Sequence, residues 1–199
     1  MYKLYKTMRK IALGCLCIVF VGCSYTPYRY SFSLVEPQSE TMNFEDSNVQ
    51  FRFVPSAENI WVAIKNKTDH DIYFVRDNAE YIDYSGVSHR IHYGYDYVQE
   101  VMNSEDYGRY VPSMRIDQSS EISRYVWVNI WPDFGIGNDR HTITANQINY
   151  LLEPFFPRYS FEGSVEDLKS STFNLILPID FGEYVHDYTF TFKIDDVLE

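Results

Sequence analysis

Alternation with a period of two residues is the feature that most limits what this chain can fold into. The clearest example is residues 188–194, YTFTFKI, in which an apolar side chain occupies every second position. Thr189, Thr191 and Lys193 lie between them. Successive side chains of a strand point to opposite faces, so this stretch predicts a strand with one buried and one polar face. Such strands are typical of antiparallel sheets.

The same kind of pattern recurs along much of the chain. Residues 49–54 (VQFRFV) and 59–66 (NIWVAIKN) flank the turn sequence PSAEN and predict a hairpin. A second hairpin is expected around Ser85-Gly86, within YIDYSGVSHRIHY. Residues 121–131, EISRYVWVNIW, are apolar on both faces, which indicates a central strand or one with an aromatic outer face. Further strands are expected at residues 71–76, 79–85 and 173–179.

Helical patterns are few. Thr144 and Gln147 have the spacing of a capping box and start a short helical stripe that Pro154 stops. Other short helices are expected at residues 97–102 and 164–168. About eight strands in roughly 150 residues, without alternating strands and helices, predict a single antiparallel β-sandwich with one or two short helices. An immunoglobulin-like topology is the working hypothesis.

Residues 24–44 leave two interpretations open. Their Pro, Ser and Tyr content suits a tether that leads from residue 23 to a domain over residues 45–199. Such a tether would reach about 25 Å. Alternatively, residues 28–34 form an edge strand, because Tyr28, Tyr30, Phe32 and Leu34 alternate with polar residues.

The first 22 residues have the layout of a secretory signal peptide. Four basic residues lie within positions 3–10, ahead of an uncharged apolar run from Ile11 to Gly22. At about 12 residues, the run is short against the roughly 20 needed to cross a bilayer as a helix. It fits the apolar region of a cleaved signal, which follows a positive region and ends at a small residue.

The end of this run, Phe20-Val21-Gly22-Cys23, resembles the lipobox of bacterial lipoproteins, with Phe20 where Leu is commoner. The resemblance implies that the thiol of Cys23 receives a diacylglycerol, that residues 1–22 are removed, and that fatty acids such as palmitate acylate the new N-terminus. Two or three acyl chains would hold the protein on a membrane, whereas one alone binds marginally. By analogy with lipoprotein sorting in Gram-negative bacteria, Ser24 in place of Asp favours the outer membrane.

Cysteine content and charge exclude several classes of function. The three cysteines are Cys15, Cys17 and Cys23, so the mature chain would keep only the acyl acceptor. Cysteine-based zinc sites and cysteine nucleophiles are therefore not expected. Removal of the signal lowers Lys+Arg from 17 to 13 against 28 Asp+Glu, which changes the net charge from −11 to −15. A chain this acidic is expected to repel nucleic acids and anionic headgroups.

The sequence carries no recognised catalytic signature. The motifs G-x-S-x-G, H-E-x-x-H, G-x-G-x-x-G and the P-loop do not occur, so we expect neither an enzyme nor a cofactor. His89 and His92 are three residues apart, which on a strand directs them to opposite faces and disfavours a shared metal. Residues 133–139, DFGIGND, have glycines at two alternate positions where a calcium loop needs acids, so we expect a turn there.

Aromatic residues are the unusual component, at 18% of the chain with 18 Tyr and 14 Phe. A group of tyrosines interleaved with acids forms a candidate binding surface: Tyr93, Tyr95, Tyr97, Tyr107 and Tyr110. Tyrosine suits interfaces that are apolar at one end and wet at the other, and it can also stack on sugars. The remaining interpretation is a loop that packs on its own side chains.

Two function classes follow. IKNKTDHDIYF (64–74), followed by YIDYSGVSHRIHY, resembles a pattern of uncharacterised bacterial lipoproteins, which implies no activity. We expect a non-catalytic envelope module, anchored through Cys23, that binds a protein partner. The alternative is a glycan-binding module or polysaccharide-processing subunit that uses Trp61, Trp127 or Trp131. An exposed Trp/Tyr row favours glycan binding, and an apolar patch with an acidic rim favours a protein partner.

Overall fold

The computed structural model describes residues 27–94, 113–129, 152–158 and 165–198. Within these ranges it contains the short helices η1 (Arg76–Asn78) and α4 (Val165–Leu168). The strands are β1 (Arg29–Glu36), β2 (Gln38–Ser39), β3 (Asn43–Glu45), β4 (Val49–Pro55), β5 (Ile60–Asn66), β6 (Ile72–Phe74), β7 (Glu80–Ile82), β8 (Ser88–Tyr93), β9 (Met114–Ile116), β10 (Glu121–Asn129), β11 (Leu152–Glu153), β12 (Thr172–Asp180) and β13 (Val185–Leu198).

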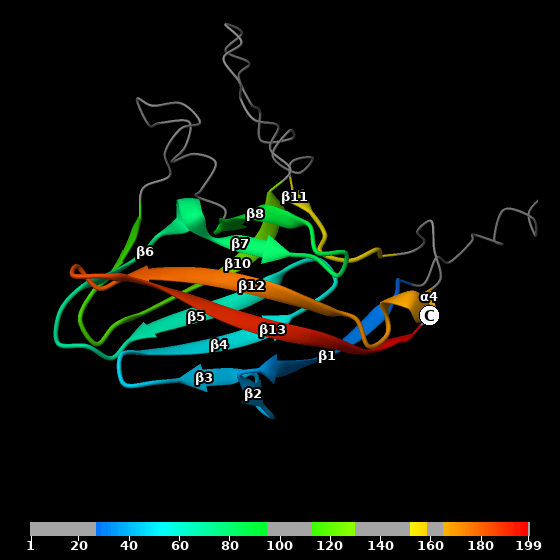
Figure 1. Ribbon diagram of the computed structural model, residues 1–199, viewed down its shortest axis with the longest axis horizontal. Helices are drawn as coiled ribbons and strands as arrows, with labels where there is room; N and C mark the ends of the chain where they lie inside the picture. The colour runs from blue at the N-terminus through cyan, green and yellow to red at the C-terminus, as the bar shows by residue number, and fades with distance from the viewer. Residues whose placement is uncertain (1–26, 95–112, 130–151, 159–164, 199) are drawn as a thin grey trace, which may run out of the picture.

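The strands pair antiparallel along the path β2-β1-β13-β12-β7-β8-β10-β5-β4-β3 (Figure 1). The short strands β6, β9 and β11 attach beside this path. Its two end strands, β2 and β3, meet, because the backbone N–H of Asn43 on β3 donates a 3.1 Å hydrogen bond to the hydroxyl oxygen of Ser39 on β2. The result is a nearly closed, barrel-like sheet. The mainly β, antiparallel expectation is confirmed, and the division into two packed sheets stays a hypothesis.

Strand β13 is the longest of the described strands, with 14 residues. It pairs with β12 from Thr172↔Lys193 to Asp180↔Val185 and with β1 on its other side. Tyr188, Phe190, Phe192 and Ile194 are buried and Thr189 is exposed, as the alternation in residues 188–194 predicts. One face of β13 is therefore apolar and the other is polar. The strand buries its apolar face alone against the rest of the sheet.

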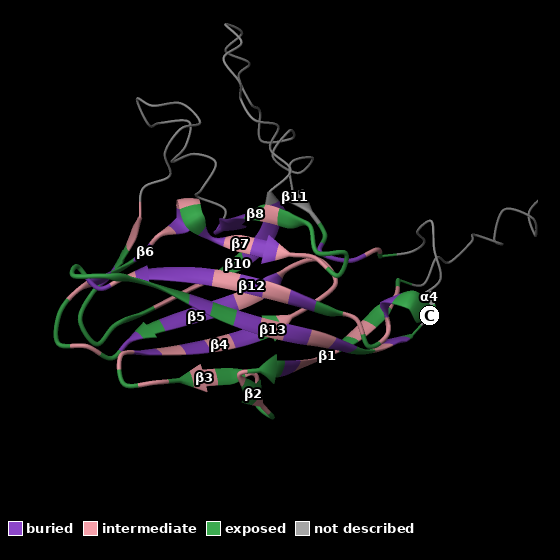
Figure 2. Cartoon of the chain, in the orientation of Figure 1, coloured by how far each residue is buried: buried purple, intermediate pink, exposed green. Residues whose placement is uncertain are grey.

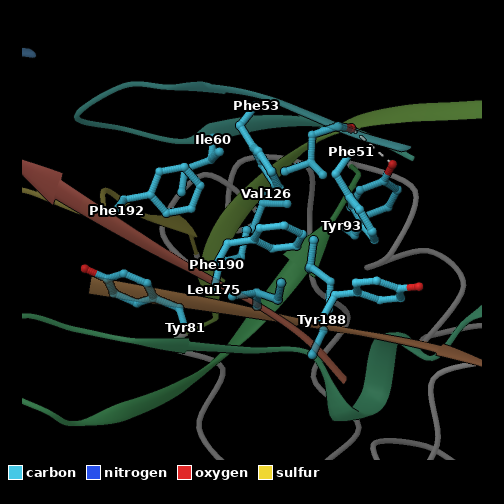
Figure 3. Close-up of a cluster of buried hydrophobic side chains, with 14 of the residues drawn as sticks. Phe51, Phe53, Ile60, Tyr81, Tyr93, Val126, Leu175, Tyr188, Phe190 and Phe192 are labelled. Atoms are coloured by element: carbon cyan, nitrogen blue, oxygen red, sulfur yellow. Dashed lines mark hydrogen bonds between the residues drawn. The ribbon is translucent and has the colours of Figure 1, made fainter. Parts of the chain in front are cut away.

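The core is rich in phenylalanine (Figure 3). Phe51 and Phe53 of β4 face Phe190 and Phe192 of β13. The Phe190 ring centroid lies 4.9 Å from that of Phe51 and 4.6 Å from that of Phe53, and the Phe53 and Phe192 centroids are 5.2 Å apart. These spacings are those of favourable tilted aromatic pairs. Ring packing thus joins β4 and β13, the two facing walls of the sheet. Buried positions alternate along both strands (Figure 2).

The structure settles the choice left open for residues 28–34, in favour of a strand. β1 pairs with β13 from Arg29↔Leu198 to Glu36↔Thr191. Leu34 is buried, and Tyr30 and Phe32 pack against the core. The domain therefore begins well before residue 45, and a tether over the whole of residues 24–44 is wrong. The physical reason is that the alternating apolar side chains of this stretch have a core face to cover.

Several other described elements agree with their sequence patterns, whereas the short strands β2, β3, β9 and β11 were not predicted. β4 and β5 form the expected hairpin, and β7 and β8 form the second, with Gly86 at φ +85° in its turn. β10 is a central strand between β8 and β5. α4 matches the helix expected at 164–168. The helix expected at 97–102 and residues 144–151 of the other expected helix lie outside the described residues. Leu152, the last residue of that expected helix, belongs instead to β11, which pairs with β10.

Candidate functional site

Only part of the candidate surface lies in the described residues. Cys23 and the loop at 133–139 are outside them, as are five aromatic candidates: Tyr95, Tyr97, Tyr107, Tyr110 and Trp131. The structure therefore bears on Tyr93, Trp61 and Trp127.

Tyr93 is a core residue, which corrects its placement on a binding surface. It is 1% exposed, its hydroxyl donates to the Val62 carbonyl oxygen at 3.2 Å, and its ring meets that of Phe74 edge-on at 5.0 Å. Burial raises the pKa of the Tyr93 hydroxyl, so it stays protonated. Tyr93 is the last residue of β8 and shares the inward face with Ile91, an alternation that its acidic, tyrosine-rich neighbourhood in the sequence obscured.

Trp127 is also inaccessible. It is 6% exposed and is the cross-strand partner of His92, which is 1% exposed. Neither residue belongs to the main core cluster. A buried indole cannot stack on a sugar ring from solvent, so Trp127 is unsuited to the role that the glycan hypothesis gave it.

Trp61 has a different setting, on the outer face of β5. Its direct cross-strand partners are Val54 on β4 and Tyr125 on β10. Val54 is 60% exposed and Tyr125 is 46% exposed, whereas Trp61 is partly buried between them. Directly opposite residues have Cβ atoms about 4.5–5.5 Å apart, so the three side chains form one continuous row across three strands.

A charged pair adjoins this row. The guanidinium carbon of Arg52 lies 5.6 Å from the Trp61 ring centroid, and an Arg52 guanidinium nitrogen lies 2.6 Å from a Glu121 carboxylate oxygen. Both charged side chains are partly exposed, so the ion pair contributes about 0–1 kcal/mol and can rearrange. We call the surface made by Arg52, Val54, Trp61, Glu121 and Tyr125 the Trp61 face.

The sequence alone did not bring the Trp61 face together. Trp61 was a candidate, but Tyr125, Val54 and Arg52 were not. The pattern of residues 121–131 did allow an aromatic outer face. The pairing of β5 with β10 is needed to place Tyr125 beside Trp61, and no local signal in either stretch specifies that register.

Asp83, Ser85 and His89 form a cluster with the residue types of a hydrolase site, but the hydrogen bonds among them are arranged differently. The Ser85 hydroxyl donates to Asp83 Oδ1 at 2.6 Å, and His89 Nε2 lies 2.8 Å from Asp83 Oδ2. A catalytic serine would instead bond to the histidine, which would take its proton. The backbone N–H groups of Ser85 and Val87 also donate to Asp83 Oδ1, so the carboxylate organises the β7–β8 turn.

Partial burial works against ionisation of Asp83, but hydrogen bonds from Ser85, His89 and Val87 outweigh it. Together they lower the pKa of the Asp83 carboxyl below its usual value. The ionised form is thus part of the folded turn, which assigns the cluster a structural role.

Asn66 is a buried polar residue whose role the sequence pattern did not reveal. Its side-chain amide donates to the carbonyl oxygens of His70, Ile116 and Asp117, at 2.7, 3.1 and 3.2 Å. Its Oδ1 accepts from the backbone N–H and the hydroxyl of Thr68. The NKTDH sequence therefore ties the β5–β6 loop to the end of β9.

The described ranges contain neither a candidate metal site nor a candidate membrane-spanning helix. No group of three or more His, Cys, Asp and Glu residues there is arranged to hold a metal ion. Likewise, none of the helices in the described ranges has the length and apolar character needed to span a bilayer. His89 and His92 lie on opposite faces of β8, as their spacing predicts, since His89 bonds to Asp83 and His92 pairs with Trp127.

The comparisons add no relative from which a site could be carried over. No protein-family model, curated protein or solved structure matches this chain. The Trp61 face is therefore argued from its own geometry.

Proposed function

We propose that this chain is a lipid-anchored bacterial envelope protein that binds a protein partner, without catalysis, through the Trp61 face. The observation that carries the proposal is the cross-strand pair of Trp61 and Tyr125, with exposed Val54 on the other side of Trp61. Two strands that are distant in the sequence thus present adjoining aromatic side chains on an outer sheet face.

The composition of this face suits protein recognition. Trp, Tyr and Arg are the residues most enriched among those that dominate binding energy at protein interfaces, and the face holds one of each. Arg52 and Glu121 supply hydrogen-bonding groups at the edge of the apolar row. An apolar centre with a polar rim is the usual anatomy of such an interface.

The anchor rests on the sequence of residues 1–24. A positive region, a short apolar run and Gly22-Cys23 together support removal of the signal and acylation of Cys23. Ser24 supports sorting to the outer membrane.

The finer fold assignment, a sandwich of immunoglobulin-like topology, belongs to the same proposal. Packing of β4 against β13 through Phe51 and Phe190 supports two facing sheets.

Glycan binding is the alternative use of the same row. Trp61 and Tyr125 could stack on sugar rings, with Glu121 as a hydroxyl partner. The position of Arg52 over the Trp61 ring argues for the protein partner, because a sugar would have to displace the guanidinium to reach the indole face. Trp127, the second tryptophan of that hypothesis in the described ranges, is buried.

The test is a pull-down of the acylated protein from membranes after crosslinking. The wild type is compared with Trp61→Ala and Tyr125→Ala, and with Tyr84→Ala as a matched control. Tyr84 is 46% exposed, as is Tyr125, but lies in the β7–β8 turn. We expect one protein partner that both face variants lose and the control keeps. Loss of the partner in the control as well, or recovery of polysaccharide in place of a protein, would contradict the proposal.

A further inference from the structure

The first and the last described segments of the chain, near residues 28 and 198, lie together on one side of the domain (Figure 1). The backbone N–H of Tyr28 donates a 2.7 Å hydrogen bond to the Arg158 carbonyl oxygen, and Arg29 pairs with Leu198. The Phe156 N–H bonds to the carbonyl oxygen of Ala57 in the β4–β5 turn. α4 lies at the same end (Figure 1). We call this the β1-start end.

The opposite end is formed by turns. It carries the β12–β13 turn with Tyr184, the β5–β6 loop and the turn after β9 (Figure 1). β13 connects the two ends, and its 14 residues span about 40 Å at about 3.3 Å per residue. Tyr184 therefore lies far from the point at which the chain enters the fold.

The link between the proposed acyl site and the fold is short. Five residue steps separate Cys23 from Tyr28, and fully extended chain covers at most about 3.6 Å per residue, so Cys23 lies within about 18 Å of Tyr28. This reach is less than half the length of β13. An anchor on so short a link cannot let both ends of the domain approach the bilayer equally.

From this geometry we propose that the β1-start end faces the membrane surface and that the β12–β13 turn points away from it. The inference rests on the proposed acylation of Cys23. The proposed partner of the β1-start end is the headgroup layer of the same bilayer that holds the acyl chains.

Charge supports the same orientation. In the segments at the far end, Lys67 is the single Lys or Arg among residues 46–48, 67–71, 117–120 and 180–187. Those segments carry seven acids: Asp46, Asp69, Asp71, Asp117, Asp180, Glu183 and Asp187. An acidic end is repelled by anionic headgroups, which disfavours the inverted arrangement.

The β1-start end is less acidic than the far end. Its segments 27–29, 56–59, 154–158, 165–171 and 195–198 hold three cations and five acids: Arg29, Arg158 and Lys169 against Glu58, Glu166, Asp167, Asp195 and Asp196. Arg29 is exposed, an Arg158 guanidinium nitrogen lies 2.5 Å from a Glu58 carboxylate oxygen, and Lys169 Nζ lies 3.0 Å from an Asp196 carboxylate oxygen. This polar surface suits contact with headgroups and not insertion into hydrocarbon. Trp61, two residues after the β4–β5 turn, then lies on the flank near the membrane, within reach of a partner that is itself membrane-bound.

The orientation can be measured with single fluorophores. Since the predicted mature chain has no cysteine besides the acylated Cys23, Leu198→Cys and Tyr184→Cys provide one label at each end; both native side chains are more than half exposed. Acylated protein is placed in vesicles of phosphatidylcholine and phosphatidylglycerol that contain a headgroup-attached nitroxide quencher. We expect severalfold stronger quenching at position 198 than at 184. A second far-end label, Glu183→Cys, should behave as position 184 does.

A matched variant tests the cause. Twenty Gly/Ser residues inserted between Thr26 and Pro27 add a flexible reach of about 25 Å, which should reduce the difference between the two labels. Equal or reversed quenching in protein that floats with the vesicles, or an unchanged difference in the insertion variant, would overturn the orientation alone. Protein that does not float with vesicles would overturn the anchor, and the orientation with it.

Discussion

The side-chain amide of Asn66 on β5 donates a 3.1 Å hydrogen bond to the backbone carbonyl oxygen of Ile116 on β9. Both residues are fully buried. The same amide holds the carbonyl oxygens of His70 and Asp117, so a single side chain links three backbone segments. A buried carbonyl group that loses such a partner is left without the water that would otherwise solvate it.

Replacement of Asn66 by Ala should therefore destabilise the fold by about 2–3 kcal/mol, because it leaves buried polar groups unsatisfied. Urea-induced unfolding measures the change in free energy. Asn43→Ala is the control, since Asn43 is exposed and its side-chain amide donates to the hydroxyl oxygen of Thr41. A loss below about 0.5 kcal/mol for Asn66→Ala would show that the linkage has little importance for stability.

The second prediction concerns Phe190, whose ring meets those of Phe51 and Phe53 in the core. Phe190→Ala removes both contacts and leaves a cavity, and it should cost about 3–5 kcal/mol. Phe190→Leu fills more of the space and should cost less. Urea unfolding of both variants checks the order; equal losses would contradict the packing described for these two walls.

The third prediction is a pH dependence at Asp83. Its pKa is lower in the folded than in the unfolded chain, so its ionised form stabilises the fold above about pH 4. This contribution is lost as the pH falls through the folded-state pKa. Asp83→Asn should be less stable than the wild type at pH 6, and the gap should narrow towards pH 3. Thermal unfolding across this range measures the gap.

Asp83→Ala separates charge from hydrogen bonding. Alanine offers no oxygen to Ser85 and Val87, whereas a protonated aspartate still does. The gap between wild type and Asp83→Ala should therefore persist at pH 3. A gap for Asp83→Asn that is constant from pH 6 to pH 3 would rule out the role of the charge.

Local patterns predicted the longer strands, because side-chain alternation depends only on neighbours in the sequence. The two- and three-residue strands β2, β3, β9 and β11 are too short for such a pattern and were not predicted. The apolar residues at alternate positions of 188–194 form the inward face of β13, and Gly86 takes the positive φ that the hairpin turn requires. β1 was one of two open interpretations, and its pairing with β13 decided the question.

Long-range pairing was not predictable in the same way. Alternation identifies a face but not the strand that covers it, so the nearly closed sheet could not be distinguished from a sandwich. β6 followed by β7 looked like two consecutive strands, yet β6 pairs with β12 and β9. Tyr93 and Tyr125 show the consequence: the first seemed accessible and is buried, and the second became a candidate only beside Trp61.

The fourth prediction concerns the anchor. Protein purified from bacterial membranes should begin at Cys23 and carry a diacylglycerol and an amide-linked fatty acid, which intact-mass measurement detects. Cys23→Ser should keep its signal, lack lipid and leave the membrane-anchored fraction. A wild-type chain that begins at Met1, or one with an unmodified Cys23, would contradict the lipoprotein proposal.

The most direct test of the central claim is site-specific photo-crosslinking in living cells. A photoreactive residue replaces Tyr125 on the Trp61 face or, as the control, the equally exposed Tyr84. The proposal predicts one dominant protein adduct from position 125, none from position 84, and loss of the adduct when Cys23→Ser releases the protein from the membrane. The same adducts from both positions, or none from position 125 in correctly anchored protein, would show that the Trp61 face does not bind a protein partner.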